Sequence, residues 1–533
     1  MTYKRTLFPI ILSLVFSFSF VFADTCPIVP LPSQFAEAGG HLNVSTLERI
    51  RVADRQLFPI AHFLQKEVLK HTGFALSLSA APGDHQSIII EFAQGAPMAD
   101  EGYKLSVYPD HAVISASTPH GAFNGVVSLL QLIRLAAAEK GEPVIACWRI
   151  SDSPQMAWRG LMLDESRHFF GMETVKRMLD WMAFYKLNRF HWHLTDVPGW
   201  RFEVKAFPDL ALVGGIGNHT DSLAPAKYYT QEEINEIVRY ARERFIEIIP
   251  EIDMPGHARA ANRAYPGFSG GGSKSYPEFT FNPGKEGTYE YLAKILREVD
   301  VLFPSKMIHV GGDEVDFGNE NWKTDADVQA LMKRNRLAGL KAVEHYFTER
   351  MADTVIHLGA KVLGWDEIAA TKIPAGDMII FWWRQNKPEA LKTAIDNGYK
   401  VVLCPRIPLY FDFVQDSAHR VGRKWAGAFS DLKSIFEYSM DRYPDIITKN
   451  NRGQVMGIQA NIWTERIVSE ARLEYMLFPR IAALAEAAWT RTEKRDYDIF
   501  LKARLPGQQT LFRRSGLHYY DVGNPSLTPE IID

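Results

Sequence analysis

Residues 307–314 read MIHVGGDE, a short apolar run followed by two glycines and two adjacent carboxylates. The apolar run is too short for a helix and is typical of a buried β-strand. The glycines let a ligand come close to the backbone beside the two acids. The segment therefore predicts a buried strand that delivers two acidic side chains to a site.

Seven further apolar runs of this kind follow residue 157, and helix-like stretches such as 172–185 and 231–245 lie between most of them. The runs are 160–163, 189–194, 246–252, 361–365, 378–383, 400–403 and 455–463. Eight short buried strands separated by crossover helices predict an α/β fold, a (β/α)8 or TIM barrel over residues 156–490. A doubly wound sheet is the weaker alternative, because no glycine-rich phosphate turn follows the first run.

The residues outside the predicted barrel divide into three parts. Residues 1–23 combine Lys4 and Arg5 with an apolar run, which predicts a signal peptide, with a retained membrane anchor as the alternative. Residues 24–155 mix short strands with helices and predict a small, non-catalytic α+β domain. Residues 491–533 predict a helical extension packed on the barrel. No segment after the signal peptide is expected to span a membrane.

The composition narrows the classes of partner. The 533 residues carry a formal net charge of −3, which gives none of the basic surface expected of a nucleic-acid-binding protein. Three scattered cysteines exclude a disulfide framework, although one pair is possible. Export with so few cysteines favours a bacterial periplasm or cell surface over eukaryotic secretion. The pattern does not indicate an oligomeric state.

Polar or aromatic residues follow nearly every predicted barrel strand. They occur at 164–165, 193–196, 251–253, 313–314, 365–367, 383–384 and 463–465. Because the C-terminal ends of barrel strands meet on one face, we expect these side chains to converge on one site. Carboxylates and aromatic rings suit the cleavage of a glycosidic bond, in which an acid protonates the leaving oxygen and flat rings pack against the sugar.

A metal site is the competing interpretation, because four histidines lie near the same strand ends. They are His191, His193, His257 and His309. Oxygen-bearing and aromatic side chains outnumber these histidines, so we expect neither a catalytic metal nor another cofactor.

Six segments, in this order, resemble glycoside hydrolase family 20. The segments are WRG at 158–160, HWHLTD at 191–196, PEIDMPGH at 250–257, HVGGDEV at 309–315, GWDE at 364–367 and IWTE at 462–465. The resemblance covers roughly residues 157–489, and residues 101–132 resemble the N-terminal domain of the family. It implies a retaining exo-acting β-N-acetylhexosaminidase that removes terminal N-acetylglucosamine or N-acetylgalactosamine from glycans or chitin oligosaccharides.

The resemblance also implies substrate-assisted catalysis, in which the 2-acetamido oxygen of the substrate attacks the anomeric carbon and gives an oxazolinium intermediate. Glu314 would be the general acid and then the base that activates water. Asp313 would accept the acetamido N–H and stabilise the developing charge. His257 and Asp196 would form a relay that supports the proton cycling of Glu314.

Further residues would bind the terminal sugar if the resemblance holds. Arg159 would bind the 3- and 4-hydroxyls, and Glu465 the 4- and 6-hydroxyls. Tyr410 would donate to the acetamide carbonyl. Asp412 would lie near the 6-hydroxyl, where its charge would repel a 6-sulfated sugar. Three tryptophans would wall the pocket: Trp365, Trp383 and Trp463.

The leaving-group side is where the chain departs from the family. Val197 and Pro198 follow Asp196 where the family has a second acid and a glutamine, so this loop should differ. Residues 267–275 are rich in glycine and serine and predict a mobile rim loop. Three alternatives stay open: release of a disaccharide such as lacto-N-biose, a non-catalytic sugar-binding barrel, and a metal-dependent deacetylase.

Overall fold

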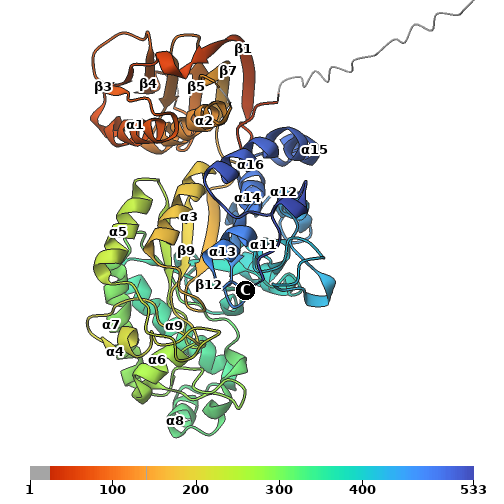
Figure 1. Ribbon diagram of the computed structural model, residues 1–533. Helices are drawn as coiled ribbons and strands as arrows, with labels where there is room; N and C mark the ends of the chain where they lie inside the picture. Colours follow the sequence, from red (N-terminus) through yellow and green to blue (C-terminus); the bar gives the residue numbers. More distant parts are fainter. Residues whose placement is uncertain (1–24, 96, 140, 533) are drawn as a thin grey trace, which may run out of the picture.

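The computed structural model describes residues 25–95, 97–139 and 141–532. The predicted signal peptide, residues 1–23, lies outside the described residues. The chain forms an N-terminal α+β domain that sits against one end of a barrel (Figure 1). The three cysteines Cys26, Cys147 and Cys404 are buried and free, so none of them forms a disulfide.

The N-terminal domain is a mixed seven-stranded sheet, with two helices on the side that faces the barrel (Figure 1). The strand order is β1-β7-β5-β6-β4-β2-β3. The strands are β1 Gln34–Asn43, β2 Arg49–Val52, β3 Ser77–Ser79, β4 Ser87–Phe92, β5 Tyr103–Val107, β6 Ala112–Ala116 and β7 Val144–Asp152. The helices are α1 Phe58–Thr72 and α2 Pro119–Ala138. The predicted α+β domain is thereby confirmed.

Helix α2 is apolar enough to be compared with a membrane span. Its 20 residues reach a mean hydropathy of 1.4, so by length and composition the expectation that no such segment exists was wrong. However, 72% of its most apolar window is buried inside the protein. A side chain at Gly125 would meet Ile114 of β6 at 2.6 Å, which shows how closely the helix packs on the sheet. This burial is typical of a core helix.

Eight parallel strands close into the barrel in the order β10-β11-β12-β13-β14-β15-β8-β9. They are β8 Trp158–Asp164, β9 Arg189–His193, β10 Glu247–Glu251, β11 Met307–His309, β12 Lys361–Trp365, β13 Met378–Trp382, β14 Lys400–Leu403 and β15 Val455–Ile462. Each strand lies within or overlaps one of the eight apolar runs. The TIM-barrel prediction is therefore confirmed.

Helices surround the barrel. The longer ones are α3 Met172–Phe184, α5 Gln231–Arg242, α7 Glu286–Leu302, α8 Ala326–Asn335, α9 Leu340–His357, α10 Pro388–Asp396, α13 Glu470–Leu477 and α14 Arg480–Trp489. Helix α5 shows why they begin where they do. The Thr230 side chain accepts from the Glu233 N–H, and the Glu233 carboxylate accepts from the Thr230 N–H. This capping box satisfies two otherwise unpaired donors.

The domains meet at the N-terminal end of the barrel through buried ion pairs. Arg159, near the start of β8, pairs with Glu101 of the N-terminal domain. Lys186 Nζ lies 3.4 Å from Asp152 Oδ2, and both side chains are fully buried. Trp489 Nε1 donates to the same carboxylate at 3.0 Å. Each domain thus supplies the counter-ion for a buried charge of the other.

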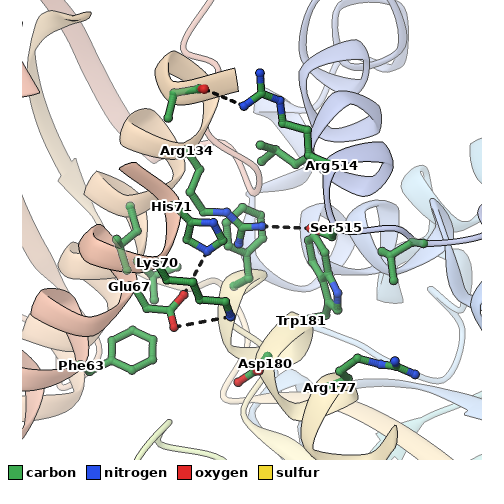
Figure 2. Close-up of a pocket in the computed structure, with 16 residues that line it drawn as sticks. Phe63, Glu67, Lys70, His71, Arg134, Arg177, Asp180, Trp181, Arg514 and Ser515 are labelled. Carbon is green, nitrogen blue, oxygen red and sulfur yellow. Dashed lines mark hydrogen bonds and ion pairs between the residues drawn. The ribbon is translucent and has the colours of Figure 1, made fainter. Parts of the chain in front are cut away.

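The C-terminal helix α16 (Leu505–Arg514) completes this junction. A pocket of about 400 Å³ lies where it meets α1, α2 and α3 (Figure 2). The Arg134 guanidinium lies 4.6 Å from the ring centre of Phe184 and donates to Ser515 Oγ at 3.4 Å. Phe512 packs on Trp181 of α3 with ring centres 5.5 Å apart. The C-terminal segment therefore contacts both domains.

The buried ion pair of Lys186 and Asp152 predicts how strongly the stability of one domain depends on the other. Lys186→Met leaves Asp152 buried without its cation, so it should cost about 3–5 kcal/mol of stability. We expect the midpoint of thermal unfolding to fall by about 3–5 °C. Lys502→Met is the matched control, because the Lys502 side chain is 69% exposed beside Asp498. Equal midpoints for the two variants would contradict this account.

Candidate active site

A pocket of about 380 Å³ opens at the C-terminal ends of the barrel strands. This is the face on which TIM barrels carry their active sites. Nine of the residues singled out from the sequence line it: His257, Asp313, Glu314, Trp365, Trp383, Tyr410, Asp412, Trp463 and Glu465. Asp196 lies directly behind His257, whereas Arg159 lies elsewhere.

The two adjacent carboxylates stand on a tight turn after β11. Gly311 and Gly312 have φ values of +67° and +92°. A side chain at Gly311 would come within 1.8 Å of Asp253 Oδ1, so the turn excludes one there. Glu314 itself takes a left-handed conformation, with φ of 51°. The turn buries Asp313 to 8% exposure and leaves the Glu314 side chain 33% exposed.

Asp313 lies in a place that disfavours a negative charge. Burial and the neighbouring Asp253 raise the pKa of Asp313 well above its usual range, although His257 opposes them. Asp313 Oδ1 has no hydrogen-bond partner within the described part of the chain. A buried acceptor without a partner is expected to be satisfied by a ligand. Its carboxylate would also be stabilised by any positive charge that develops in the pocket.

His257 connects the two carboxylates. Its Nδ1–H donates to Asp196 Oδ1 at 2.9 Å. Its Nε2 lies 3.5 Å from Asp313 Oδ2 and 3.7 Å from Glu314 Oε2. Burial lowers the pKa of His257, but Asp196 and Asp313 outweigh it and raise the pKa to about 9. The imidazole is therefore protonated at neutral pH and can donate towards either pocket carboxylate.

A buried network fixes this relay from behind. The second oxygen of Asp196 lies 2.8 Å from His193 Nε2 and 2.7 Å from an Nη of Arg167. His193 Nδ1 donates to Glu251, whose other oxygen accepts from Trp365 Nε1 at 2.8 Å. Burial opposes the charge on His193, but Glu251 and Asp196 raise its pKa well above the ordinary value. The network thus joins a pocket wall to the relay.

Aromatic rings form the inner walls of the pocket. Trp365 and Trp463 lie with ring centres 5.9 Å apart, and Trp383 stacks on Tyr410 at 6.2 Å with an interplanar angle of 13°. Trp382 points the other way and donates from Nε1 to a backbone carbonyl outside the pocket. Such rings suit the apolar face of a small ring-shaped ligand.

Charged side chains line a second wall. Arg423 Nε lies 2.8 Å from Asp412 Oδ2, and its Nη2 donates to Glu465 at 2.6 Å. Burial raises the pKa of Asp412 to about 7, although Arg423 opposes this. Burial would also raise the pKa of Glu465, but Arg167 and Arg423 hold it below the usual range. Arg423 is shared by the two carboxylates Asp412 and Glu465, and the expected repulsion of a 6-sulfated sugar stays a prediction.

Arg159 is not brought to the pocket, and its predicted role is corrected. It is the second residue of β8, so it lies at the opposite end of the barrel. Its guanidinium is 1% exposed, binds Glu101 and donates to the carbonyl of Met156 at 2.8 Å. Residues that follow a barrel strand reach the active face, whereas those that begin one cannot.

Arg167 takes the place expected for Arg159. It lies in the loop after β8 and lines the pocket. Its guanidinium lies 5.0 Å from the Trp463 ring centre, in addition to its contact with Asp196. The sequence carried one signal that could have identified Arg167 as a pocket residue, namely its position shortly after the first barrel strand.

Sequence reasoning also missed the outer part of the pocket. Arg406, Phe413 and Arg423 line it, together with three exposed aromatic residues. The exposed residues are Tyr276 at 42%, Phe317 at 42% and Trp425 at 45%. All three lie in irregular loops or short 3-10 turns, where no periodicity marks a functional side chain.

Some buried groups lie close enough together to hold a cation. Among the described residues, four such sets have donor atoms within 4.8 Å of one another. The first is His191, Glu251 and His309, the second is His257, Asp313 and Glu314, and the other two combine Asp253 with Asp196 and His257 or with Glu251 and Asp313. In the first set, the Gln459 amide contacts His191 Nδ1 at 3.0 Å, and Glu251 accepts from Trp365. The second set is the relay itself. These contacts suit proton transfer. Treatment with a chelator distinguishes proton transfer from metal-dependent catalysis.

The raised pKa of His257 gives a direct test. Asp196→Asn removes the strongest charge that raises it, so the titration midpoint should fall from about 9 towards 6.5. Because the folded pKa exceeds the unfolded one, this ion pair stabilises the fold fully below pH 6.5 and is lost as the pH rises through about 9. Histidine-selective NMR titration measures both midpoints, with His257→Gln to assign the signal. An unchanged midpoint in Asp196→Asn would disprove the pairing.

Family models match both domains. The glycosyl hydrolase family 20 catalytic domain matches residues 156–492, and domain 2 of the same family matches residues 25–153. Together these matches cover most of the chain.

Individual relatives agree with these matches. A β-hexosaminidase of Porphyromonas gingivalis is 32% identical over 92% of this chain, and one of Vibrio furnissii is 36% identical over 73%. The chain spans 64% and 65% of the length of these two relatives, just under two thirds. The crystal structure of a family 20 exo-β-N-acetylglucosaminidase from Vibrio harveyi, in complex with N-acetylglucosamine, superimposes with a TM-score of 0.85 at 32% identity, over 93% of this chain and 79% of that one. The chain belongs to glycosyl hydrolase family 20.

Proposed function

We propose that this chain is a β-N-acetylhexosaminidase that removes a terminal β-linked N-acetylhexosamine from glycans or chitin oligosaccharides. One observation carries the proposal: Asp313 and Glu314 face His257 inside a pocket walled by aromatic rings. Its volume of about 380 Å³ lies near the lower end of the range for small-molecule sites, which favours one sugar over two. The names of the family 20 relatives support the same activity.

The proposed reaction needs no protein nucleophile. The acetamido oxygen of the substrate attacks the anomeric carbon, and the glycosidic bond breaks as its oxygen takes a proton from Glu314. Asp313 accepts the acetamido N–H through its unpartnered oxygen and stabilises the oxazolinium ion. Water then attacks the same carbon while Glu314 takes back a proton, so the β-configuration is retained.

His257 supports both proton transfers. As an imidazolium it stabilises Glu314 after the acid has lost its proton. The contact with Asp196 holds the ring in place and keeps its charge. The imidazolium also offsets the negative charge of Asp313.

The sugar-binding roles follow from position. Arg167 and Glu465 lie on one wall, where they suit the hydroxyls of the terminal sugar. Arg423 forms ion pairs with both Glu465 and Asp412 and so links Asp412 to the same wall. Tyr410, stacked on Trp383, can donate its hydroxyl to the acetamide carbonyl. Export is part of the proposal and rests on the apolar run within residues 1–23.

The general acid gives the first test of the proposed activity. Glu314→Gln should lower kcat on a chromogenic β-N-acetylglucosaminide by on the order of 10³-fold. A thiazoline mimic of the cyclised intermediate should inhibit the wild type tightly. Treatment with a chelator should change nothing, whereas a metal-dependent deacetylase would lose activity. A folded wild type that releases only disaccharides, or turns over no substrate, would overturn the proposal.

The two arginines give a matched pair of variants. Arg167→Met should lower kcat/KM by about 100-fold, because charge-assisted hydrogen bonds to the sugar are lost. Arg159→Met should change kcat/KM by less than about twofold but lower the unfolding midpoint, because it leaves Glu101 without its cation. Steady-state kinetics and thermal unfolding of both variants measure this. The reverse pattern would restore Arg159 as the sugar ligand.

A further inference from the structure

The pocket of about 400 Å³ at the junction of the two domains lies at the opposite end of the barrel from the active site. Helices α1 and α2 of the N-terminal domain, α3 of the barrel and α16 with the residues that follow it supply its lining (Figure 2). Its volume is within the range of small-molecule sites. A ligand in this junction pocket would contact both domains and the C-terminal segment at once.

Arg134 is the side chain in this pocket with unused hydrogen-bonding capacity. Figure 2 shows it reaching from α2 across the pocket towards Ser515. Its hydrogen bond from Nη2 to Ser515 Oγ is long, at 3.4 Å, and its buried Nε has no partner within the described part of the chain. The guanidinium lies 4.6 Å from the ring centre of Phe184 and 5.3 Å from that of Trp181. Aromatic faces hold it in place without using its N–H donors.

The Arg134 cation also lacks a carboxylate at contact distance. Among the described residues, Glu67 and Asp180 act on it only from beyond ion-pair distance. Glu67 instead contacts His71 Nε2 at 3.2 Å, and Asp180 accepts from Arg244 Nε at 2.6 Å. Burial lowers the pKa of the Arg134 guanidinium, and Glu67 opposes this only in part. Because a guanidinium stays charged in a folded protein, a bound anion would supply the missing partner.

The rest of the lining adds positive charge. Lys70, Arg177 and Arg514 also line the pocket, so four cationic side chains lie there with two carboxylates. Arg177 pairs with Glu470, and Arg514 donates to the backbone carbonyls at the end of α2. Arg134 is therefore the cation best placed to bind a ligand, and the excess of positive charge favours an anionic one.

Apolar side chains complete the wall of the junction pocket. Besides Trp181 and Phe184 they are Phe63, Val127, Leu130, Ala137, Leu511 and Leu517. Such a wall suits the apolar part of a ligand. The planar fork of a guanidinium matches a carboxylate, to which it can donate two parallel hydrogen bonds. The two features together suit a molecule with a carboxylate at one end and a compact apolar group at the other.

We propose that the junction pocket binds a small organic carboxylate, with its carboxylate on Arg134 and its apolar group against the aromatic and aliphatic wall. The site is separate from the catalytic pocket and does not depend on the proposed hydrolase activity. Because both domains contribute to the site, the ligand binds only the assembled chain and stabilises the junction between the domains.

The test compares two probes of the same shape that differ in charge, 4-fluorobenzoate and 4-fluorobenzamide, on the full chain. Fluorine NMR of the probes measures their dissociation constants. The wild type should bind the benzoate about 10- to 100-fold more tightly than the benzamide, because only the carboxylate accepts charge-assisted hydrogen bonds. Arg134→Met should weaken benzoate binding to the level of the benzamide and leave benzamide binding unchanged.

Two further variants test where the probes bind. Ala137→Phe keeps Arg134 but adds bulk to a residue that lines the junction pocket, so it should abolish binding of both probes. Arg423→Met is the matched control, because it removes an arginine that lines the catalytic pocket, and it should bind the benzoate like the wild type.

The opposite results would overturn the proposal. Equal binding of the two probes by the wild type, or binding of neither, would exclude a carboxylate site. Loss of benzamide binding in a folded Arg134→Met would mean that Arg134 only shapes the pocket. Unchanged binding in Ala137→Phe, or loss of the benzoate in Arg423→Met, would place the anion elsewhere. If Arg134→Met does not fold, the preference of the wild type and the result for Ala137→Phe decide the question.

Discussion

Asp196 is the buried charge on which the active site depends. Its carboxylate contacts His257, His193 and Arg167, and these partners hold its pKa well below the usual range although burial opposes them. Breaking a buried charge pair by removing one partner costs far more than losing a surface contact. The cations must therefore stay where Asp196 can reach them. This constraint sets the position of the His257 ring before any substrate arrives.

The same constraint reaches the pocket walls, because a buried carboxylate accepts a hydrogen bond from two of the three wall tryptophans. Trp365 donates to Glu251, and Trp383 donates to Glu367 at 3.1 Å. Glu251 is also the partner of His193, so the wall and the relay share one anion. A pocket built in this way is preorganised, which is where much of the catalytic advantage of an enzyme arises.

The sequence predicted the regular elements of the fold, but it could not predict the contacts made by irregular loops. Eight apolar runs mark the barrel strands, and the glycines before Asp313 and Glu314 mark the turn that delivers them. Arg159 was misplaced because a motif names residues without saying which end of a strand they occupy. Arg423 is 11 residues beyond its partner Asp412, in an irregular loop, so only the folded chain shows that they pair.

The exchange of counter-ions between the two domains has a consequence for modularity. The barrel carries Arg159 and Lys186 at its N-terminal end. Their carboxylate partners, Glu101 and Asp152, belong to the neighbouring domain. A barrel produced alone, or fused to an unrelated domain, would leave these two cations without their carboxylate partners. We therefore expect a domain exchange at this boundary to keep the fold stable only when both acids are retained.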